Sequence, residues 1–326
     1  MRTASSKAAL HTLRFLGGRI GGLLATLLAS SFVVFGALYL APGSPITFLT
    51  HGRSMTPEAI AQINEQYHFD EPFIVQYVRW LGGILQGDFG RSILYKDAVG
   101  SLLGQRIGTT VALIALSALL VALIGLGIGI FSGLKPGVAA SALMGVSTAA
   151  MAVPTFVAAV VLTLVFAVEL GWFPVFGVGE NPIDMLYHLI LPAFALALAS
   201  IAFVARLSQA AIRQEITADH VQTAISRGFP YGVVVRRHVL RNASLPVLTV
   251  LGLTLAGMIS GTVVVEQVFQ LNGLGSLLVS SVQQKDFPVV QAICLVYVTA
   301  FIVLNTVIDL AYSVLDPRVS VGGGKS

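Results

Sequence analysis

The sequence predicts an all-α polytopic membrane protein with six transmembrane helices. Of its 326 residues, 56% are hydrophobic and only 10% are charged, whereas a soluble domain usually carries about 25% charged residues. The apolar residues gather into long uncharged runs. At about 1.5 Å per residue, roughly 20 helical residues cross a hydrocarbon core of about 30 Å. Polarity does not alternate within these runs, so helices are predicted rather than the strands of a barrel.

The first span is predicted at residues 20–41, after a basic N-terminal segment, residues 1–19. A basic start before an apolar run is also typical of a cleaved signal peptide. This run is long for a signal peptide, and the following Ala-Pro-Gly-Ser-Pro is not a small-x-small cleavage site. An uncleaved anchor is therefore expected.

A long polar segment, residues 42–106, follows the first span. Thr56-Pro57-Glu58 has the composition of a helix start: a capping residue, a first-turn proline and an acid. Residues 73–85 (FIVQYVRWLGGIL) are amphipathic. They predict a helix that lies either at the membrane interface or against the protein's own spans.

The second and third spans are predicted at residues 107–134 and 142–168. Gly125, Gly129 and Gly133 recur every four residues in the second span, which predicts a small-residue ridge where another helix approaches closely. Pro154 lies inside the third span and predicts a kink, because proline lacks the backbone donor and clashes with the preceding turn.

The fourth, fifth and sixth spans are predicted at residues 186–205, 243–265 and 287–308. Pro192 is expected to break the fourth span near its start. A basic loop, residues 206–242, separates the fourth span from the fifth, and residues 309–326 form a tail.

The distribution of charge predicts the topology. Six spans place both termini on one side, and the segments on that side carry 13 of the 19 Lys and Arg residues. They carry 4 of the 15 Asp and Glu residues. By the positive-inside rule the basic side is cytoplasmic. Both termini are therefore expected in the cytoplasm.

The predicted spans contain no Asp, Glu, Lys or Arg. Ion-coupled carriers generally need ionisable groups within the membrane, which disfavours a self-sufficient secondary carrier or channel. A membrane enzyme would need a constellation around His188, which is better explained as an interfacial or packed histidine. The single Cys294 excludes a disulfide framework. The C-terminal Gly-Gly-Gly-Lys-Ser lacks the first glycine and the following helix of a phosphate-binding loop. If the protein does work, the energy is therefore expected to come from a partner.

The stretch 219–246 (DHVQTAISRGFPYGVVVRRHVLRNASLP) is the most informative polar segment. Asp219 is expected to cap a short helix, with Val221, Ala224 and Ile225 as its apolar face and Gly228 as a left-handed residue after its end. Residues 231–241 predict a second helix with a basic C-terminal end. The spacing of these residues favours neither of two interpretations: the loop lies at anionic lipid headgroups, or it docks a partner protein.

The motif Ala224-x-x-x-Gly228, followed by His238-x-x-Arg241-Asn242-Ala243 and Pro246, resembles the "EAA" loop of binding-protein-dependent ABC importer permeases. It is most similar to the B-type subunits of the dipeptide, oligopeptide and nickel group. Here Gln222 and Thr223 stand where the broad motif has Glu and Ala, and His220 and Gln222 where the peptide group usually has Tyr and Arg.

Further segments resemble the same family in the same order along the chain. They are PGSP at 42–45, YVRWL at 77–81, GDFGRS at 87–92, VPTF at 153–156, GWFP at 171–174, HLILP at 188–192, EQVF at 266–269, GLG at 273–275, DFP at 286–288 and DPR at 316–318. Ser44 replaces an Asp of the family pattern, and Asn272 a Pro.

The resemblance implies a type I ABC importer permease fold, with residues 107–308 as the permease core. It implies a peptide-transporting, non-enzymatic subunit that pairs with a homologous permease, two ATPase subunits and an extracytoplasmic solute-binding protein. It implies no cofactor in this chain, with ATP and Mg bound by the ATPases. Nickel and glutathione importers share the pattern and remain alternatives as substrate classes.

The candidate residues fall into four groups. The ATPase-coupling residues are Asp219, Val221, Gln222, Ala224, Ile225, Gly228 and Phe229. The residues expected to set topology and anchor the loop are Arg236, Arg237, His238 and Arg241. The helix kinks are Pro154 and Pro192. The candidate contacts for the binding protein are Trp80, Asp88, Glu266 and Asp286, in segments 73–92 and 266–288 that packing over the pore would explain equally well. No metal site and no catalytic residue are predicted.

Overall fold

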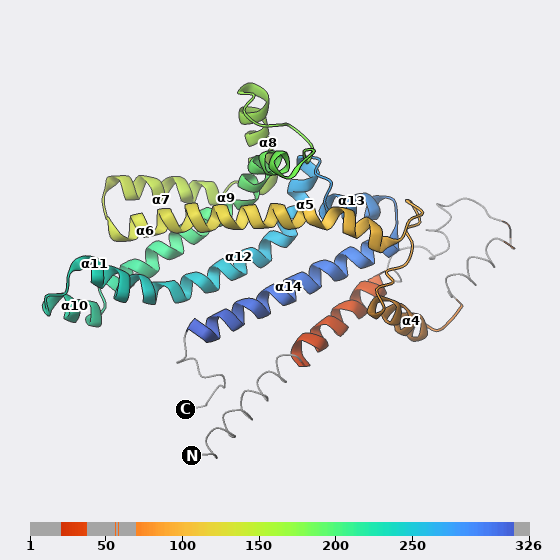
Figure 1. Cartoon of the computed structure of the whole chain (residues 1–326), viewed down its shortest axis with the longest axis horizontal. Helices are drawn as coiled ribbons and strands as arrows, with labels where there is room; N and C mark the ends of the chain where they lie inside the picture. The colour runs from red at the N-terminus through yellow and green to blue at the C-terminus, as the bar shows by residue number, and fades with distance from the viewer. Residues whose placement is uncertain (1–20, 38–55, 57, 59–69, 316–326) are drawn as a thin grey trace, which may run out of the picture. The chain divides into compact units, whose positions relative to one another are not determined.

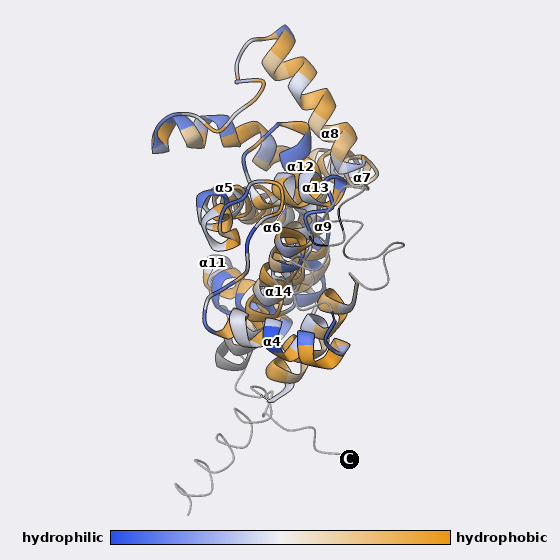
Figure 2. Ribbon diagram, turned by 90° about the vertical axis from the view of Figure 1, so that its right-hand side faces the viewer, coloured by the Kyte–Doolittle hydropathy of each residue, from blue (hydrophilic) through white to orange (hydrophobic). Residues whose placement is uncertain are grey.

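The computed structural model describes residues 21–37, 56, 58 and 70–315, and these residues form an α-helical membrane protein (Figure 1). Four helices are long and apolar enough to cross a membrane: Val99–Leu134, Pro182–Ile216, Tyr231–Val268 and Phe287–Ile308. A fifth span results if the bent pair Val138–Met151 and Thr155–Glu169 counts as one. Figure 2 shows the apolar colouring along these helices. The helical membrane class is confirmed, and the count of six spans stays a prediction.

The predicted first span coincides with the 17-residue apolar helix Gly21–Ala37. The rest of that span lies outside the described residues, together with the segment 1–19, the PGSP motif at 42–45 and the DPR motif at 316–318. Pro57 of the predicted helix start is outside them too.

The chain divides into two compact units, and the first comprises residues 1–106, 277–302 and 321–326. In this unit α4 (Phe73–Leu85) packs on the helix Gly21–Ala37. The rings of Phe35 and Trp80 lie 5.3 Å apart, and the hydroxyls of Ser31 and Tyr77 are hydrogen bonded at 2.8 Å. The amphipathic segment is therefore held against the protein's own apolar helix through its aromatic face.

The second unit comprises residues 107–276 and 303–320 and is built around α9 (Pro182–Ile216). α9 contacts α6, α7, α8 and α12. It begins four residues before the predicted span because Asn181 caps it, accepting hydrogen bonds from the amides of Ile183 and Asp184. The predicted break at Pro192 is wrong: α9 continues through this buried proline as one 35-residue helix, at the expense of one backbone hydrogen bond.

The predicted glycine ridge is confirmed. It lies on the π-helical turn η1 (Val121–Gly125) and on α6 (Leu126–Leu134), which continue the helix α5 (Val99–Leu120). A Cβ added at Gly129 would lie 2.4 Å from Cβ of Ser208, and one at Gly133 would lie 2.8 Å from Cγ2 of Ile212. Real Cβ atoms do not approach so closely, so glycine is what permits the contact between α6 and α9.

The predicted kink at Pro154 is a complete break. α7 (Val138–Met151) ends before it, and α8 (Thr155–Leu162) continues into the π-helical segment η2 (Thr163–Glu169) at 107° to α7. Pro154 has ψ 140° and caps α8 instead of lying inside a helix. Proline lacks an amide hydrogen to continue the previous helix, and its fixed φ suits the position before a new one.

The remaining elements are α10 (Asp219–Ser226), α11 (Tyr231–Val234), the π-helical turn η3 (Val235–Val239), α12 (Leu240–Val268), α13 (Leu274–Gln283) and α14 (Phe287–Leu315). Because α12 runs three residues beyond the predicted fifth span, Glu266 lies in its last turn. The predicted span 243–265 contains no acid, but the observed helix extends beyond it and includes Glu266.

Candidate functional site

α10 is held by a small apolar contact surface. Val221 and Ala224 are buried, and they pack with Ala211, Val234, Val239 and Ala243 from the ends of α9, α11, η3 and α12. The third residue of the predicted apolar face, Ile225, is 44% exposed. Val221 and Ala224 therefore position α10, while Ile225 faces outward.

The end of α10 has the geometry that the sequence predicted. Gly228 has φ +80°, a conformation that favours glycine. Its amide donates to the carbonyl of Ile225 at 2.9 Å, and the amide of Phe229 donates to the carbonyl of Ala224 at 3.3 Å. The start differs by one residue: Ala218 is the N-cap, and Asp219 lies in the first turn, where its charge suits the helix dipole.

Apolar side chains next to this turn are exposed. Phe229 is 51% and Tyr231 61% exposed, and they follow the 44% exposed Ile225. We call Ile225, Phe229 and Tyr231 the docking face. Three large apolar side chains around one tight turn are a feature of protein contact sites rather than of a solvated loop.

A polar cluster ties α10 to its neighbours. Nε2 of His220 lies 3.3 Å from Oε2 of Glu215 in α9, and 3.1 Å from Nδ2 of Asn242 in α12. The same Asn242 amide donates to Glu215 at 3.3 Å. Gln222 Nε2 donates to the carbonyl of Ile216 at 2.9 Å. His220 and Gln222, two of the three residues that depart from the family pattern, thus contact the end of α9.

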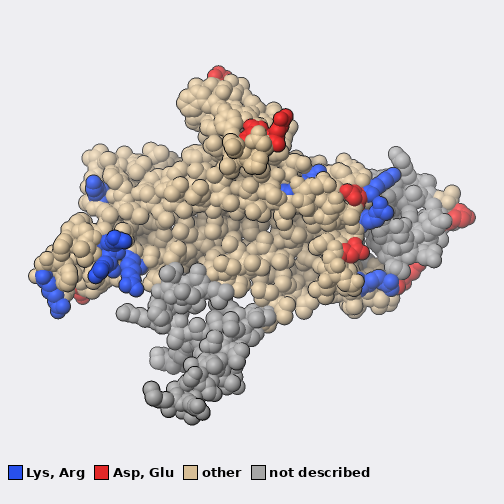
Figure 3. All heavy atoms as spheres, viewed as in Figure 1, with Lys and Arg blue, Asp and Glu red and all other residues tan. Residues whose placement is uncertain are grey.

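The predicted second helix of the loop, residues 231–241, is not separate. α11, η3 and α12 form one continuous helical segment, Tyr231–Val268. The basic residues stand in its first turns: Arg236, Arg237 and Arg241 are exposed and His238 is half-buried. Figure 3 shows Lys and Arg side chains gathered in the part of the second unit where α10 and α11 lie, and acidic side chains near α8.

Glu266, predicted as a candidate external contact, is instead fully buried. Its carboxylate accepts hydrogen bonds from the Thr110 hydroxyl at 2.6 Å and from the amides of Gly275 and Ser276 at 2.7 and 3.1 Å. A Cβ at Gly273 would lie 2.3 Å from the carboxyl carbon. The GLG motif therefore leaves room for a carboxylate that caps the start of α13.

Asp286 is also fully buried, within the first unit. Its carboxylate accepts hydrogen bonds from the Ser92 hydroxyl at 2.5 Å and from the amides of Ile93 and Leu94 at 3.2 Å each. The GDFGRS and DFP motifs, almost 200 residues apart in sequence, therefore form one structure. Sequence reasoning did not identify Ser92 or Thr110 as partners, because nothing in a local pattern announces a partner so distant in the chain.

The other two candidate contacts differ from these carboxylates. Asp88 is exposed, and its Oδ1 accepts a hydrogen bond from the amide of Gly90 at 2.9 Å. Trp80 is half-buried in the aromatic contact with Phe35. The carboxylates of Glu266 and Asp286 are not available at the surface of the described chain, so contact with a binding protein by these segments would fall to exposed residues such as Asp88.

His188 has a local partner. Its Nδ1 lies 2.9 Å from the carbonyl oxygen and 3.3 Å from Oδ1 of Asp184, one turn earlier in α9. Within the described residues no group of three or more His, Cys, Asp or Glu side chains is placed to hold a metal ion.

Long apolar helices, several of them packed around α9, and a loop helix with exposed apolar side chains define a multi-span membrane protein. The chain belongs to the family of binding-protein-dependent transport system inner membrane components, whose model matches residues 125–321. The N-terminal model of this membrane component matches residues 12–114. The chain is therefore a permease subunit of the bacterial inner membrane, and in this family the ATPase is a separate partner.

Two curated relatives extend over almost the whole chain. The oligopeptide transport system permease protein AppB of Bacillus subtilis (strain 168) is 36% identical over 301 residues, covering 89% of this chain and 92% of that protein. The probable peptide ABC transporter permease protein y4tP of Sinorhizobium fredii is 32% identical over 305 residues, covering 92% and 97%.

Two solved structures share the fold. One is an inward-facing MetNI methionine ABC transporter, with a TM-score of 0.56 and 17% identity over 66% of this chain and 96% of that chain. The other is an amino acid ABC transporter, with a TM-score of 0.51 and 19% identity over 65% and 93%. They confirm the predicted type I importer permease fold, and the comparisons do not favour a self-sufficient carrier.

Proposed function

We propose that this chain forms half of the translocation pathway of an ATP-driven importer for peptides. Family membership supports the permease role, and the names of the two relatives support peptides as the substrate class. The complete transporter would contain a second homologous permease, two ATPase subunits that bind ATP and Mg, and an extracytoplasmic solute-binding protein. Nickel chelates and glutathione are the competing substrates.

The docking face is the observation that carries the coupling role. α10 is fixed on one side by buried Val221 and Ala224, while Ile225 and Phe229 stay exposed on the other. A helix held this way would move as one unit with the helix ends on which it packs. Pressure on its exposed side reaches α9 and α12 directly, because the buried side contacts the ends of both helices.

The proposed orientation places the docking face, the basic turns and both termini in the cytoplasm. The concentration of Lys and Arg in residues 206–242 supports it through the positive-inside rule. ATP-driven closure of the ATPases would move α10. The packed helices α9, α6 and α12 would then transmit the movement to the pathway, since a close-packed interior shifts as connected elements. The segments 73–92 and 266–288 would lie on the side of the binding protein.

The test is to replace Phe229 with Ser in the complete complex. Burial of a phenylalanine side chain contributes about 1.5–3 kcal/mol, so co-purification of the ATPase should weaken by roughly tenfold or more, and peptide-stimulated ATP hydrolysis should fall. The matched control is Ile183→Ser, since Ile183 is an 81% exposed apolar residue at the other end of α9. Normal ATPase binding and normal stimulation in Phe229→Ser would show that the docking face is assigned wrongly.

The substrate class needs a separate measurement. Uptake by the complex with its cognate binding protein is compared for labelled di- and oligopeptides, a nickel chelate and glutathione. Peptide uptake alone supports the proposal. Selective uptake of either competitor would correct the substrate and leave the docking face unaffected.

A further inference from the structure

The carbonyl oxygen of Ser132, in the last turn of α6, has no donor within its own helix. The amide four residues later belongs to Pro136, and proline carries no amide hydrogen. Ser132 itself is fully buried. A buried carbonyl without a donor costs free energy comparable to a lost hydrogen bond. A partner from elsewhere in the fold is therefore needed at this helix end.

Two side chains of α9 supply the missing donors. Nη2 of Arg213 donates to the Ser132 carbonyl at 3.2 Å, and Nε2 of Gln209 donates to the same oxygen at 3.4 Å. Gln209 and Arg213 are four residues apart and therefore lie on one face of α9. A cation also suits the negative end of the α6 dipole. The end of α6 is thus capped by the neighbouring helix instead of by its own backbone.

Close packing brings the two helices within reach of these hydrogen bonds. A Cβ added at Gly129 would overlap Ser208, and one added at Gly133 would overlap Ile212. Ser208 and Ile212 each directly precede one of the two donors in the sequence. The glycine ridge therefore places both donors against the end of α6, so the apolar and polar contacts between the helices act at the same place.

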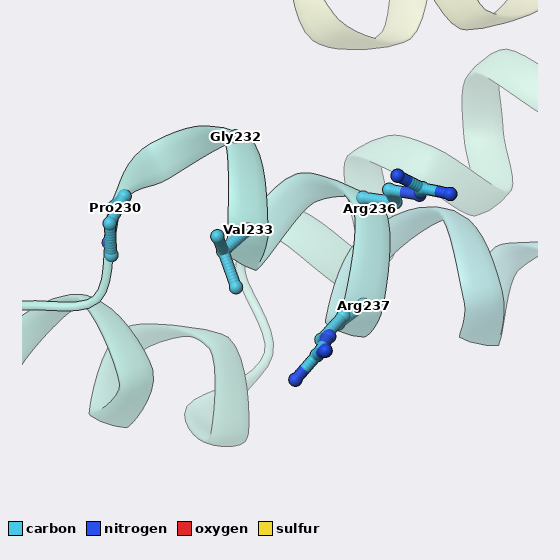
Figure 4. A pocket seen from close by; sticks show the side chains of 5 residues that line it. All are labelled: Pro230, Gly232, Val233, Arg236 and Arg237. Carbon is cyan, nitrogen blue, oxygen red and sulfur yellow. The ribbon is translucent and has the colours of Figure 1, made fainter.

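Arg213 differs from the other arginines of residues 206–242. Of the six arginines there, all within the described chain, Arg213 is the one whose guanidinium makes a hydrogen bond. Figure 4 shows two of the others, Arg236 and Arg237, which point in different directions from successive positions of η3. The positive-inside rule accounts for a basic loop as a whole, but it does not account for a defined partner on another helix.

The turn of α9 that carries Arg213 also supports α10. His220 of α10 contacts Glu215, and Gln222 of α10 donates to the carbonyl of Ile216 at 2.9 Å. Apolar side chains of α6 pack against the cluster that buries one side of α10. The last turn of α9 is therefore the common support of α10 and of the end of α6.

We propose that Arg213 is a positioning residue for energy coupling. By fastening the end of α6 to the last turn of α9, it makes α6 follow the movement that α10 receives from the ATPase. Gln209 assists from one turn earlier by donating to the same carbonyl. The inference rests on the proposed docking of an ATPase at α10, and it adds the residue through which the movement reaches α6.

A first experiment measures how firmly the two elements are held together in the complete complex. Spin labels are attached at Lys135→Cys after α6 and at Arg227→Cys after α10, both exposed positions, in a Cys294→Ser background. The distance distribution should become clearly broader in Arg213→Met, which keeps the apolar stem and removes the donors. Because Arg213 is an exposed residue, this replacement should leave the chain folded. An unchanged distribution would overturn the proposal.

A second experiment measures the peptide transported per ATP hydrolysed by the reconstituted complex. Arg213→Met should lower this ratio by roughly two- to tenfold, the range that follows from the net contribution of one hydrogen bond, while the ATPase co-purifies as with the wild type. Arg213→Lys keeps the charge and a donor and should restore most of the ratio. The matched control is Arg206→Met, which removes an exposed arginine of the same helix without loss of a hydrogen bond and should leave the ratio unchanged.

The possible failures can be told apart. A normal ratio in Arg213→Met, or an equal loss in Arg206→Met, would overturn the role of Arg213. A lower ratio that appears only together with loss of the bound ATPase would show that Arg213 contacts the ATPase instead. An error in the docking face appears in a different measurement, since Phe229→Ser would then bind the ATPase normally.

Discussion

The hydroxyl of Thr110 in α5 donates a hydrogen bond of 2.6 Å to Oε1 of Glu266 in the last turn of α12. The same Thr110 oxygen accepts a hydrogen bond from the amide of Leu274 at 2.8 Å. Glu266 in turn accepts from the amides of Gly275 and Ser276. One fully buried carboxylate thereby joins the middle of α5, the end of α12 and the start of α13.

The first prediction concerns the hydrogen bond between Thr110 and Glu266. Thr110→Val should lower the free energy of unfolding by about 1–3 kcal/mol, because it leaves a buried carboxylate oxygen and the Leu274 amide without their partner. Thermal unfolding in detergent measures the loss. Thr109→Val, at the adjacent buried position, is the comparison variant. Equal stability of Thr110→Val and the wild type would mean that the hydrogen bond contributes nothing.

The second prediction concerns the glycine ridge. Gly129→Ala should destabilise the protein by about 1–3 kcal/mol, because its Cβ would overlap Ser208 and overpacking shifts the neighbouring backbone. Gly127→Ala is the matched control: it lies on the same helix with nothing within 4 Å of its added Cβ, and alanine is the better helix former. The two melting temperatures should therefore move in opposite directions. If both melting temperatures change in the same direction, helix propensity rather than packing determines the effect of the added methyl group.

The third prediction separates structural from contacting carboxylates in the first unit. Asp286→Ala should lower stability, because the Ser92 hydroxyl and the amides of Ile93 and Leu94 lose their common acceptor. Asp88→Ala should leave the melting temperature almost unchanged, since Asp88 is exposed.

The variants Asp286→Ala and Asp88→Ala also test the proposed contact with the binding protein. Stimulation of ATP hydrolysis by the binding protein is measured for both variants in the complex. A lower stimulation for Asp88→Ala with intact stability would support a direct contact at Asp88. Full stimulation in that variant would remove Asp88 from the candidate contacts.

The fourth prediction concerns the polar cluster beside α10. A double-mutant cycle of His220→Ala and Glu215→Ala should give a coupling energy below about 1 kcal/mol for unfolding, because both side chains are partly exposed. The ratio of peptide transported to ATP hydrolysed should fall in His220→Ala, since α10 loses a contact with the ends of α9 and α12. His220→Asn retains a polar contact and should recover part of the ratio. An unchanged ratio in His220→Ala would show that the cluster is only structural.

The features best predicted from the sequence are those that depend on neighbouring residues or on helical spacing. Gly228 adopts the predicted left-handed conformation because the following Pro230 and the lack of a Cβ both favour an end to α10 there. The ridge at Gly129 was predicted because three glycines at intervals of four share one helix face. The partner of the ridge, Ser208 in α9, was not, since no local pattern encodes which helix packs on which.

Element ends and the environment of charges were predicted less well. Pro154 and Pro192 have the same local chemistry, yet one separates two helices at 107° and the other lies inside a continuous one. The difference is in the surroundings: Pro192 is buried in the core around α9, where packing compensates for one lost hydrogen bond. Glu266 is predicted as an external contact because a carboxylate is expensive in a span, and the donor that lies farthest from it in the sequence, Thr110, is announced by no local pattern.

The sequence by itself determined the helical membrane class, the charge asymmetry and the resemblance to importer permeases, because hydrophobicity and motif order are properties of the chain read residue by residue. The tertiary structure decided which acids are buried, which side of α10 is exposed and which helix fills the glycine ridge. Each of these depends on residues distant in sequence approaching within hydrogen-bonding or van der Waals distance. For Glu266 one of the three donors that allow its burial is Thr110, 156 residues away in the chain.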